Sequence, residues 1–118
     1  MHELSVAEEI VNISRQYLPK ENNVHVKSIT IKIGRLSNIL PDSLLFCYES
    51  LIDNTPLNGS KLIIEEIPIR INCMKCGKNS ETDHISFLCP NCNSSEIKIE
   101  SGTELLISEI ELFENNLE

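Results

Sequence analysis

Four of the five cysteines occur as two pairs, and the two members of each pair are separated by two residues. Cys73 and Cys76 form the first pair, and Cys89 and Cys92 form the second after twelve intervening residues. A two-residue gap allows one tight turn to direct both sulfur atoms toward a single point. Two such turns facing each other supply the tetrahedron of thiolates that Zn²⁺ prefers. The spacing therefore predicts a four-cysteine zinc site.

Four thiolates would fill the coordination shell of the metal, so this site is expected to stabilise a small module rather than to carry out chemistry. Gly77 can adopt the open backbone conformation that such a turn needs, and Pro90 stiffens the second turn. Two alternatives remain open at this point. The pairs could be reducing dithiols or disulfides, or they could hold iron in a rubredoxin-like centre.

The first three residues form a second candidate metal site. Met1 is expected to be retained, because the initiator methionine is usually removed only when the next residue is small. Its amine, together with the amide nitrogen and imidazole of His2, could then chelate one ion, and Glu3 could add an oxygen. Such ligands suit Ni²⁺ or Cu²⁺ in tetragonal geometry. Taken alone, however, a histidine at position 2 is far more often a mobile surface residue.

The remaining cysteine and histidines are interpreted as structural or surface residues. Cys47 lies on the apolar stripe of a predicted helix, so we expect a small buried core residue there. His25 stands at the start of a predicted strand. His84 lies in the cysteine module without an obvious partner.

Two helices are predicted to support these sites. Apolar residues recur at helical spacing over residues 4–18, and Ser5 with Glu8 reads as a capping box at the start of that helix. Pro41 and Asp42 open a second helix, because proline suits a first helical turn and an acidic side chain suits its positive end.

Strands are predicted at residues 24–33, 61–71 and 103–113, and Pro68 suggests an edge position for the later half of the second. The order of elements favours an α+β fold, in which two helices cover a small three-stranded sheet. The cysteines form a zinc-ribbon-like module inserted between two strands. We therefore expect one domain from residues 1–71 and 101–118, and a zinc-binding module at residues 72–100.

Charge and hydropathy exclude several classes of protein. The formal net charge is -8, and the chain from Glu81 to Glu118 carries nine acidic residues and one basic residue, Lys98. Such a surface repels phosphate, which argues against a nucleic-acid partner. No apolar run is long enough to span a bilayer, and no signal peptide is visible. We expect a cytoplasmic protein, with reduced thiols and no membrane partner.

Four stretches, spread in order along the whole chain, together resemble the HypA/HybF family of hydrogenase maturation nickel chaperones. The first is the opening Met-His-Glu-Leu-Ser, and the second is Ile-Lys-Ile-Gly-Arg-Leu-Ser at residues 31–37. The third is the double cysteine motif. The fourth is Ser-Gly-Thr-Glu-Leu-Leu-Ile at residues 101–107. Each motif alone would be unspecific, whereas the combination is specific.

The resemblance implies a nickel site in the first domain, with His2 as the essential ligand and the Met1 amine and Glu3 as helpers. Asp42 is the nearest candidate for a further acidic ligand. The family's zinc ligands carry over to Cys73, Cys76, Cys89 and Cys92. Zn²⁺ would then fix the structure, and Ni²⁺ would be cargo for the large-subunit precursor of [NiFe]-hydrogenase. The implied partners also include the GTPase HypB and, in some bacteria, the urease accessory proteins.

Three rival classes remain to be compared with this interpretation. The first is a zinc-ribbon interaction module that binds protein or RNA and has no role with nickel. An RNA binder of this size would carry a basic face, whereas this chain has 10 basic and 18 acidic residues. An enzyme is disfavoured, because the sequence contains no nucleophile–base pair, phosphate loop or open catalytic metal set. An iron redox carrier would be red, whereas a zinc protein is colourless.

Overall fold

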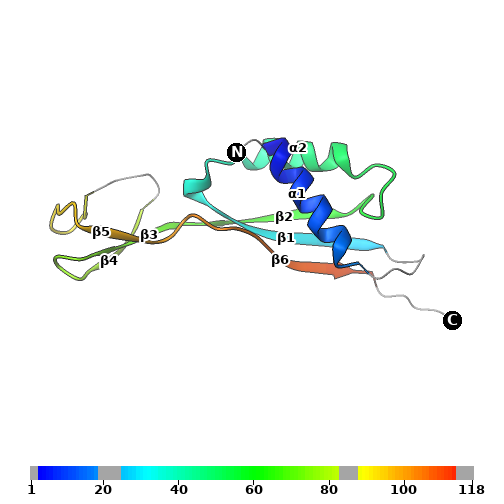
Figure 1. Ribbon diagram of the computed structural model, residues 1–118. Helices are drawn as coiled ribbons and strands as arrows, with labels where there is room; N and C mark the ends of the chain where they lie inside the picture. The colour runs from blue at the N-terminus through cyan, green and yellow to red at the C-terminus, as the bar shows by residue number, and fades with distance from the viewer. Residues whose placement is uncertain (1–2, 19–24, 83–87, 114–118) are drawn as a thin grey trace. The chain divides into compact units, whose positions relative to one another are not determined.

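The computed structural model describes residues 3–18, 25–82 and 88–113. Within these ranges the order of elements is two helices interleaved with two strands, followed by four further strands (Figure 1). The chain divides into two compact units. The first, the helical unit, comprises residues 1–31, 39–64 and 107–118, and the second, the cysteine unit, comprises residues 32–38 and 65–106.

Helix α1 spans Glu3–Gln16 and buries one face, which consists of Val6, Ala7, Ile10, Val11 and Ser14. The helix therefore begins two residues before Ser5, and the predicted capping box is wrong. The side chain of Glu3 instead accepts a hydrogen bond from the backbone amide of Leu40, at 2.8 Å. Tyr17, which falls within the predicted helical range of residues 4–18, follows the end of the helix and is 74% exposed.

Helix α2 spans Pro41–Leu51, with the proline in its first turn as predicted. Leu44 and Tyr48 are fully buried, and the Tyr48 hydroxyl shares a 2.5 Å hydrogen bond with the hydroxyl of Ser60. Figure 1 shows both helices over the same face of the sheet that β1, β2 and β6 form. Their buried apolar residues, with Ile29 and Ile31 of β1, make the core of the helical unit.

The first sheet has the strand order β2-β1-β6, where β1 is Val26–Gly34, β2 is Lys61–Ile67 and β6 is Leu105–Leu112. The last strand thus pairs with the first. The carbonyl of His25 accepts a hydrogen bond from the Phe113 amide at 3.0 Å, and the Gly34 amide donates to the Glu104 carbonyl at 2.8 Å. Because these two contacts join opposite ends of the strands, β1 and β6 are antiparallel.

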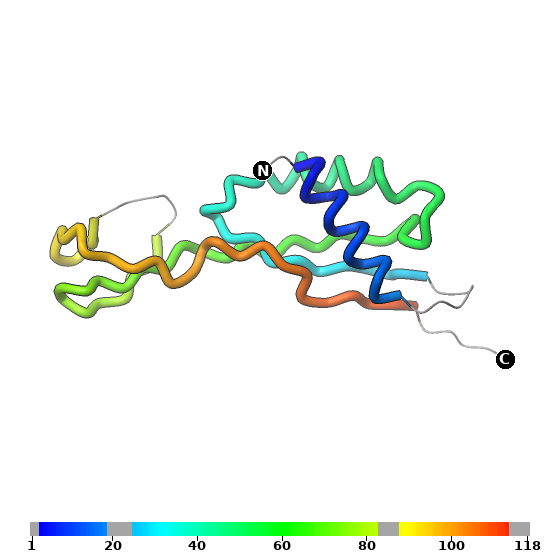
Figure 2. The backbone as a smooth tube through the Cα atoms, in the orientation of Figure 1, coloured from blue at the N-terminus to red at the C-terminus, as the bar shows by residue number. Residues whose placement is uncertain are grey.

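A second sheet lies in the segment between β2 and β6, with the order β4-β3-β5. Strand β3 is Ile69–Cys73, β4 is Asn79–Thr82 and β5 is Ile97–Ser101, and both pairings are antiparallel. Figure 2 traces the chain from β2 into β3 and back from β5 into β6. The prediction of an α+β fold with two helices, a three-stranded sheet and an inserted cysteine module is confirmed.

Pro68 explains why one predicted strand is two. It separates β2 from β3, because proline has no backbone N–H to donate to a ladder. The prediction of an edge position for the later half is wrong, since β3 is the central strand of the second sheet. The carbonyl of Pro68 accepts a hydrogen bond from the Ser101 hydroxyl at 2.8 Å. None of the helices in the described ranges is long and apolar enough to cross a membrane.

Candidate metal centre

The first cysteine pair sits on a hydrogen-bonded turn at the end of β3. The amide of Cys73 donates to the carbonyl of Lys78 at 3.0 Å, and the amide of Gly77 donates back to the carbonyl of Cys73 at 2.9 Å. Gly77 has a φ of 76°, the left-handed conformation that glycine adopts without steric cost. The amide of Cys76 points inward and donates to the Cys73 sulfur at 3.3 Å. We call this turn the first knuckle, residues 73–78.

The second cysteine pair repeats this geometry in residues 89–94, the second knuckle. The amide of Cys89 donates to the carbonyl of Ser94, and the amide of Asn93 donates to the carbonyl of Cys89, both at 2.8 Å. Asn93 takes the place of Gly77, with a φ of 64°. This role of Asn93 was not predicted from the sequence, although asparagine is enriched among non-glycine residues in that conformation.

The two knuckles bring the four sulfur atoms to one point. All four lie within 4.8 Å of one another, the Cys73 and Cys92 sulfurs are 3.5 Å apart, and the Cys76 and Cys89 sulfurs are 3.8 Å apart. A metal with bonds of about 2.3 Å to four sulfurs has sulfur–sulfur edges of about 3.8 Å. The cysteines are free thiols rather than disulfides. The cluster is therefore a four-cysteine metal site, and its donor set fits a tetrahedral ion that favours thiolates.

The site is unequally exposed to solvent. Cys73 and Cys89, the first member of each pair, are 1% and 2% exposed. Cys76 and Cys92, the second members, are exposed. Solvent therefore reaches the cluster through one member of each knuckle.

Backbone amides lower the basicity of two of these sulfurs. The amide of Cys76 is the main reason that the pKa of the Cys73 thiol lies below its usual value, and burial acts in the opposite direction. The pKa of Cys76 falls to about 6, first because the Lys78 amide donates to its sulfur and then because the Asn91 side chain does so. These donors favour the thiolate form, which is the form that binds metal.

Cys92 is affected in the opposite sense. The amide of Ser94 lowers its pKa, but the sulfur of Cys73, burial and the other two sulfurs together outweigh that amide and raise the pKa to about 12. Neighbouring thiolates repel one another, so without a metal the cluster as a whole holds on to protons. A metal must displace protons to bind the sulfurs, so metal affinity falls as the pH falls.

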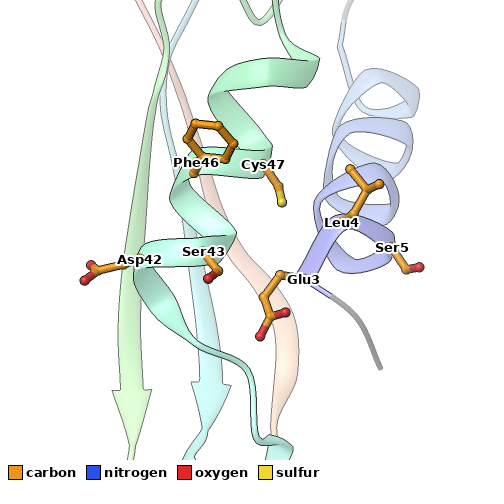
Figure 3. Close-up of a pocket in the computed structure, with 7 residues that line it drawn as sticks. All are labelled: Glu3, Leu4, Ser5, Asp42, Ser43, Phe46 and Cys47. Carbon is orange, nitrogen blue, oxygen red and sulfur yellow. The ribbon is translucent and has the colours of Figure 1, made fainter.

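The N-terminal candidates are described only in part. Met1 and His2 lie outside the described residues. Glu3 and Asp42 both line a hollow between the first turns of α1 and α2. Figure 3 shows the Asp42 carboxylate pointing away from that of Glu3. The structure thus brings the two residues to one region without bringing their carboxylates together.

Cys47 also lines this hollow and is only half-buried, so the prediction of a buried core residue is wrong. Figure 3 shows its sulfur directed toward α1, where the hollow leaves it partly open. His25 is exposed and does not belong to the four-cysteine cluster. His84 lies outside the described residues.

The fold and the cluster define the class of protein: a small α+β protein that carries a four-cysteine metal site. The family described as "Hydrogenase/urease nickel incorporation, metallochaperone, hypA" matches residues 1–112. The chain therefore belongs to the HypA family of nickel metallochaperones, which are maturation factors and not enzymes.

Individual relatives agree with this assignment. The chain is 39% identical over 113 residues to the hydrogenase maturation factor HypA of Desulfatibacillum aliphaticivorans, covering 95% of this chain and 87% of that protein. It is 38% identical over 115 residues to HypA of Desulfosudis oleivorans, covering 97% and 100%. Its fold is similar to the solution structure of the Ni metallochaperone HypA from Helicobacter pylori, with a TM-score of 0.63, 20% identity and coverage of 95% and 97%.

Proposed function

We propose that this chain binds Ni²⁺ at its N-terminus through His2 and delivers it to the large-subunit precursor of [NiFe]-hydrogenase, while Zn²⁺ in the cysteine cluster stabilises the fold. The observation that carries this proposal is the match of residues 1–112, which include the whole N-terminal motif, to a nickel-incorporation family. The assignment of each metal is supported by the chemistry of its own set of ligands.

Zinc is favoured at the cysteine cluster by its ligands and by its spacing. Four thiolates suit Zn²⁺, which is almost always bound by four tetrahedral ligands in structural sites. The sulfur–sulfur separations of 3.5 and 3.8 Å are close to those of such a tetrahedron. A filled shell leaves no place for an incoming ligand, so this ion would stay with the protein as a structural component.

Nickel is favoured at the N-terminus because the candidate ligands adjoin one another. Met1 and His2 directly precede Glu3, whose carboxylate lies beside the start of α2 and accepts the amide of Leu40. The Met1 amine, the backbone and imidazole nitrogens of His2 and an oxygen of Glu3 form a ligand set of nitrogen and oxygen, as Ni²⁺ prefers. Asp42 lines the same hollow, and its side chain would have to rotate to join the same ion.

Delivery requires a site that can give up its metal. Four thiolates fill the coordination shell of an ion in the cysteine cluster, whereas an ion held by Met1, His2 and Glu3 would be open to the ligands of a partner. We therefore assign the cargo to the N-terminus. On this proposal the partners in the cytoplasm are the GTPase HypB, the hydrogenase precursor and, in hosts with urease, its accessory proteins.

The test is a nickel titration of untagged protein with its native N-terminus, followed by calorimetry and metal analysis. His2→Ala should abolish specific nickel binding, because it removes the imidazole around which the chelate forms, and it should leave zinc content unchanged. His25→Ala, which removes an exposed histidine elsewhere, is the matched control and should bind nickel normally. A His2→Ala protein that binds one Ni²⁺ with wild-type affinity would refute the assignment of the nickel site to the N-terminus.

A further inference from the structure

Asn91 contacts sulfur atoms of both knuckles. Its backbone amide donates to the sulfur of Cys89 in its own knuckle, at 3.3 Å. Its side-chain amide reaches across to the first knuckle, where Nδ2 donates to the sulfur of Cys76 at 3.6 Å. A thiolate sulfur can only accept hydrogen bonds, so the NH₂ group of the asparagine is the end that faces it.

The sulfur that Asn91 reaches is one of the two exposed ones. Cys76 is exposed, whereas Cys73 and Cys89 are buried. Competing ligands in the solvent therefore have access to the bond between Cys76 and a metal. A donor on that sulfur spreads the negative charge of the four thiolates and fixes the position of the sulfur.

We infer that Asn91 is a positioning residue of the metal centre, whose side chain holds the exposed sulfur of Cys76 against the second knuckle and slows release of the metal on the solvent side. This inference rests on the proposed zinc assignment. It assigns to Asn91 a function that the spacing of the cysteines does not specify, because the contact exists only when the two knuckles face each other.

Asn79 provides a matched control for this position. It is also an exposed asparagine of the cysteine unit, but its side-chain oxygen accepts from Asn72 at 2.6 Å and contacts no sulfur. Asn91→Ala and Asn79→Ala therefore make the same chemical change in one module. Asn91→Asp keeps the shape of the side chain and replaces its donor with a carboxylate that faces a thiolate.

The experiment measures how fast the zinc-loaded full chain loses zinc to a chromophoric chelator. Asn91→Ala should lose zinc about 10-fold faster than wild type, in the range typical of lost outer-sphere partners. Asn91→Asp should lose it faster still, because like charges repel. Asn79→Ala should match wild type. With Co²⁺ in place of zinc, Asn91→Ala should shift the sulfur-to-metal charge-transfer band to lower energy, because a sulfur without its donor is more electron-rich.

Three outcomes would overturn the inference. Equal rates for Asn91→Ala and Asn79→Ala would mean that the Asn91 contact has no specific effect: either neither side chain matters, or both substitutions loosen the module in general. An Asn91→Asp protein that retains zinc like wild type, or a Co²⁺ spectrum unchanged in Asn91→Ala, would mean that no hydrogen bond acts on the sulfur. A wild-type protein that binds no zinc would instead refute the proposed zinc assignment itself, which separates the two failures.

Discussion

Ser14 is buried on α1, and within the described residues its hydroxyl has no hydrogen-bond partner. A buried hydroxyl without a partner loses its hydration and gains nothing in return. Ser14→Ala should therefore raise the free energy of unfolding by about 1 kcal/mol, since alanine also has the higher helix propensity. Urea unfolding followed by circular dichroism measures this change.

Ser28→Ala is the control for that prediction. Ser28 is also buried, but its hydroxyl donates to the carboxylate of Glu111 at 3.1 Å. This substitution should lower the free energy of unfolding by about 1 kcal/mol. A loss of stability in Ser14→Ala as large as in Ser28→Ala would show that the Ser14 hydroxyl is bonded to buried water.

At the residue scale the sequence identified much of the metal site and little of its surroundings. The grouping of the four cysteines and the left-handed conformation of Gly77 both follow from local spacing. The contact of Asn91 with Cys76 does not, because it depends on how two separate turns face each other. The half-buried position of Cys47 also depends on packing, since a helical stripe alone does not reveal a hollow between two helices.

At the element scale, the end of β1 and the segment before β6 approach each other closely at Gly34 and Gly102. The Leu36 amide donates to the Gly102 carbonyl at 2.7 Å, and a Cβ atom on Gly34 would overlap that carbonyl group. Gly34 has a φ of -75°, which any residue can adopt, so the cost of a substitution is purely steric. Gly34→Ala should therefore lower the free energy of unfolding by about 3 kcal/mol or more, as measured by thermal or urea unfolding.

Gly59→Ala is the control for that prediction. Gly59 has a φ of 83°, and no atom lies within 4 Å of the position that an alanine methyl group would take, so alanine there meets conformational strain alone. Its cost should be about 1 kcal/mol. If Gly34→Ala proved no more harmful than Gly59→Ala, the backbone of residues 101–103 would have to move away readily.

Helices and strands were predictable where one local signal dominates. Pro41 marks the first turn of α2, and the isoleucines of β1 mark a buried strand. The prediction failed where a distant contact decides. Glu3 begins α1 while its side chain binds the amide of Leu40, 37 residues away, and no capping rule anticipates this. The sequence predicts an edge position at Pro68 within one continuous strand, whereas Pro68 separates β2 from β3, and the second sheet that follows it requires partners from β4 and β5.

At the scale of the whole molecule, the division into two units predicts a local response to metal removal. Chelation of zinc should abolish the protection of the Cys73 and Cys89 amides from hydrogen exchange, because the knuckles contain little apolar surface and depend on the metal. The amides of Leu44 and Ser60 in the helical unit should keep their protection, since their hydrogen bonds lie beside a separate core. Exchange measured by NMR with and without chelator tests this.

Cys73→Ala should reproduce the effect of the chelator without any added reagent. Simultaneous loss of protection at Leu44 and at the knuckles, in either experiment, would mean that the two units unfold as one. In that case the metal would contribute to the stability of the entire protein rather than to the cysteine unit.

The long segment between β2 and β6 is joined at its base, where Arg70 pairs with Ser101 and the Ser101 hydroxyl binds the carbonyl of Pro68, 33 residues earlier. Bringing two points so far apart in sequence together costs about 3 kcal/mol of chain entropy. If the metal site forms first, the entropy cost of closing this segment has been overcome before β6 pairs with β1. The closed segment then holds β6 close to β1. Lack of the metal in a cell would thus delay closure of the first sheet in newly made chains, leaving β1 exposed as an edge on which another chain could pair.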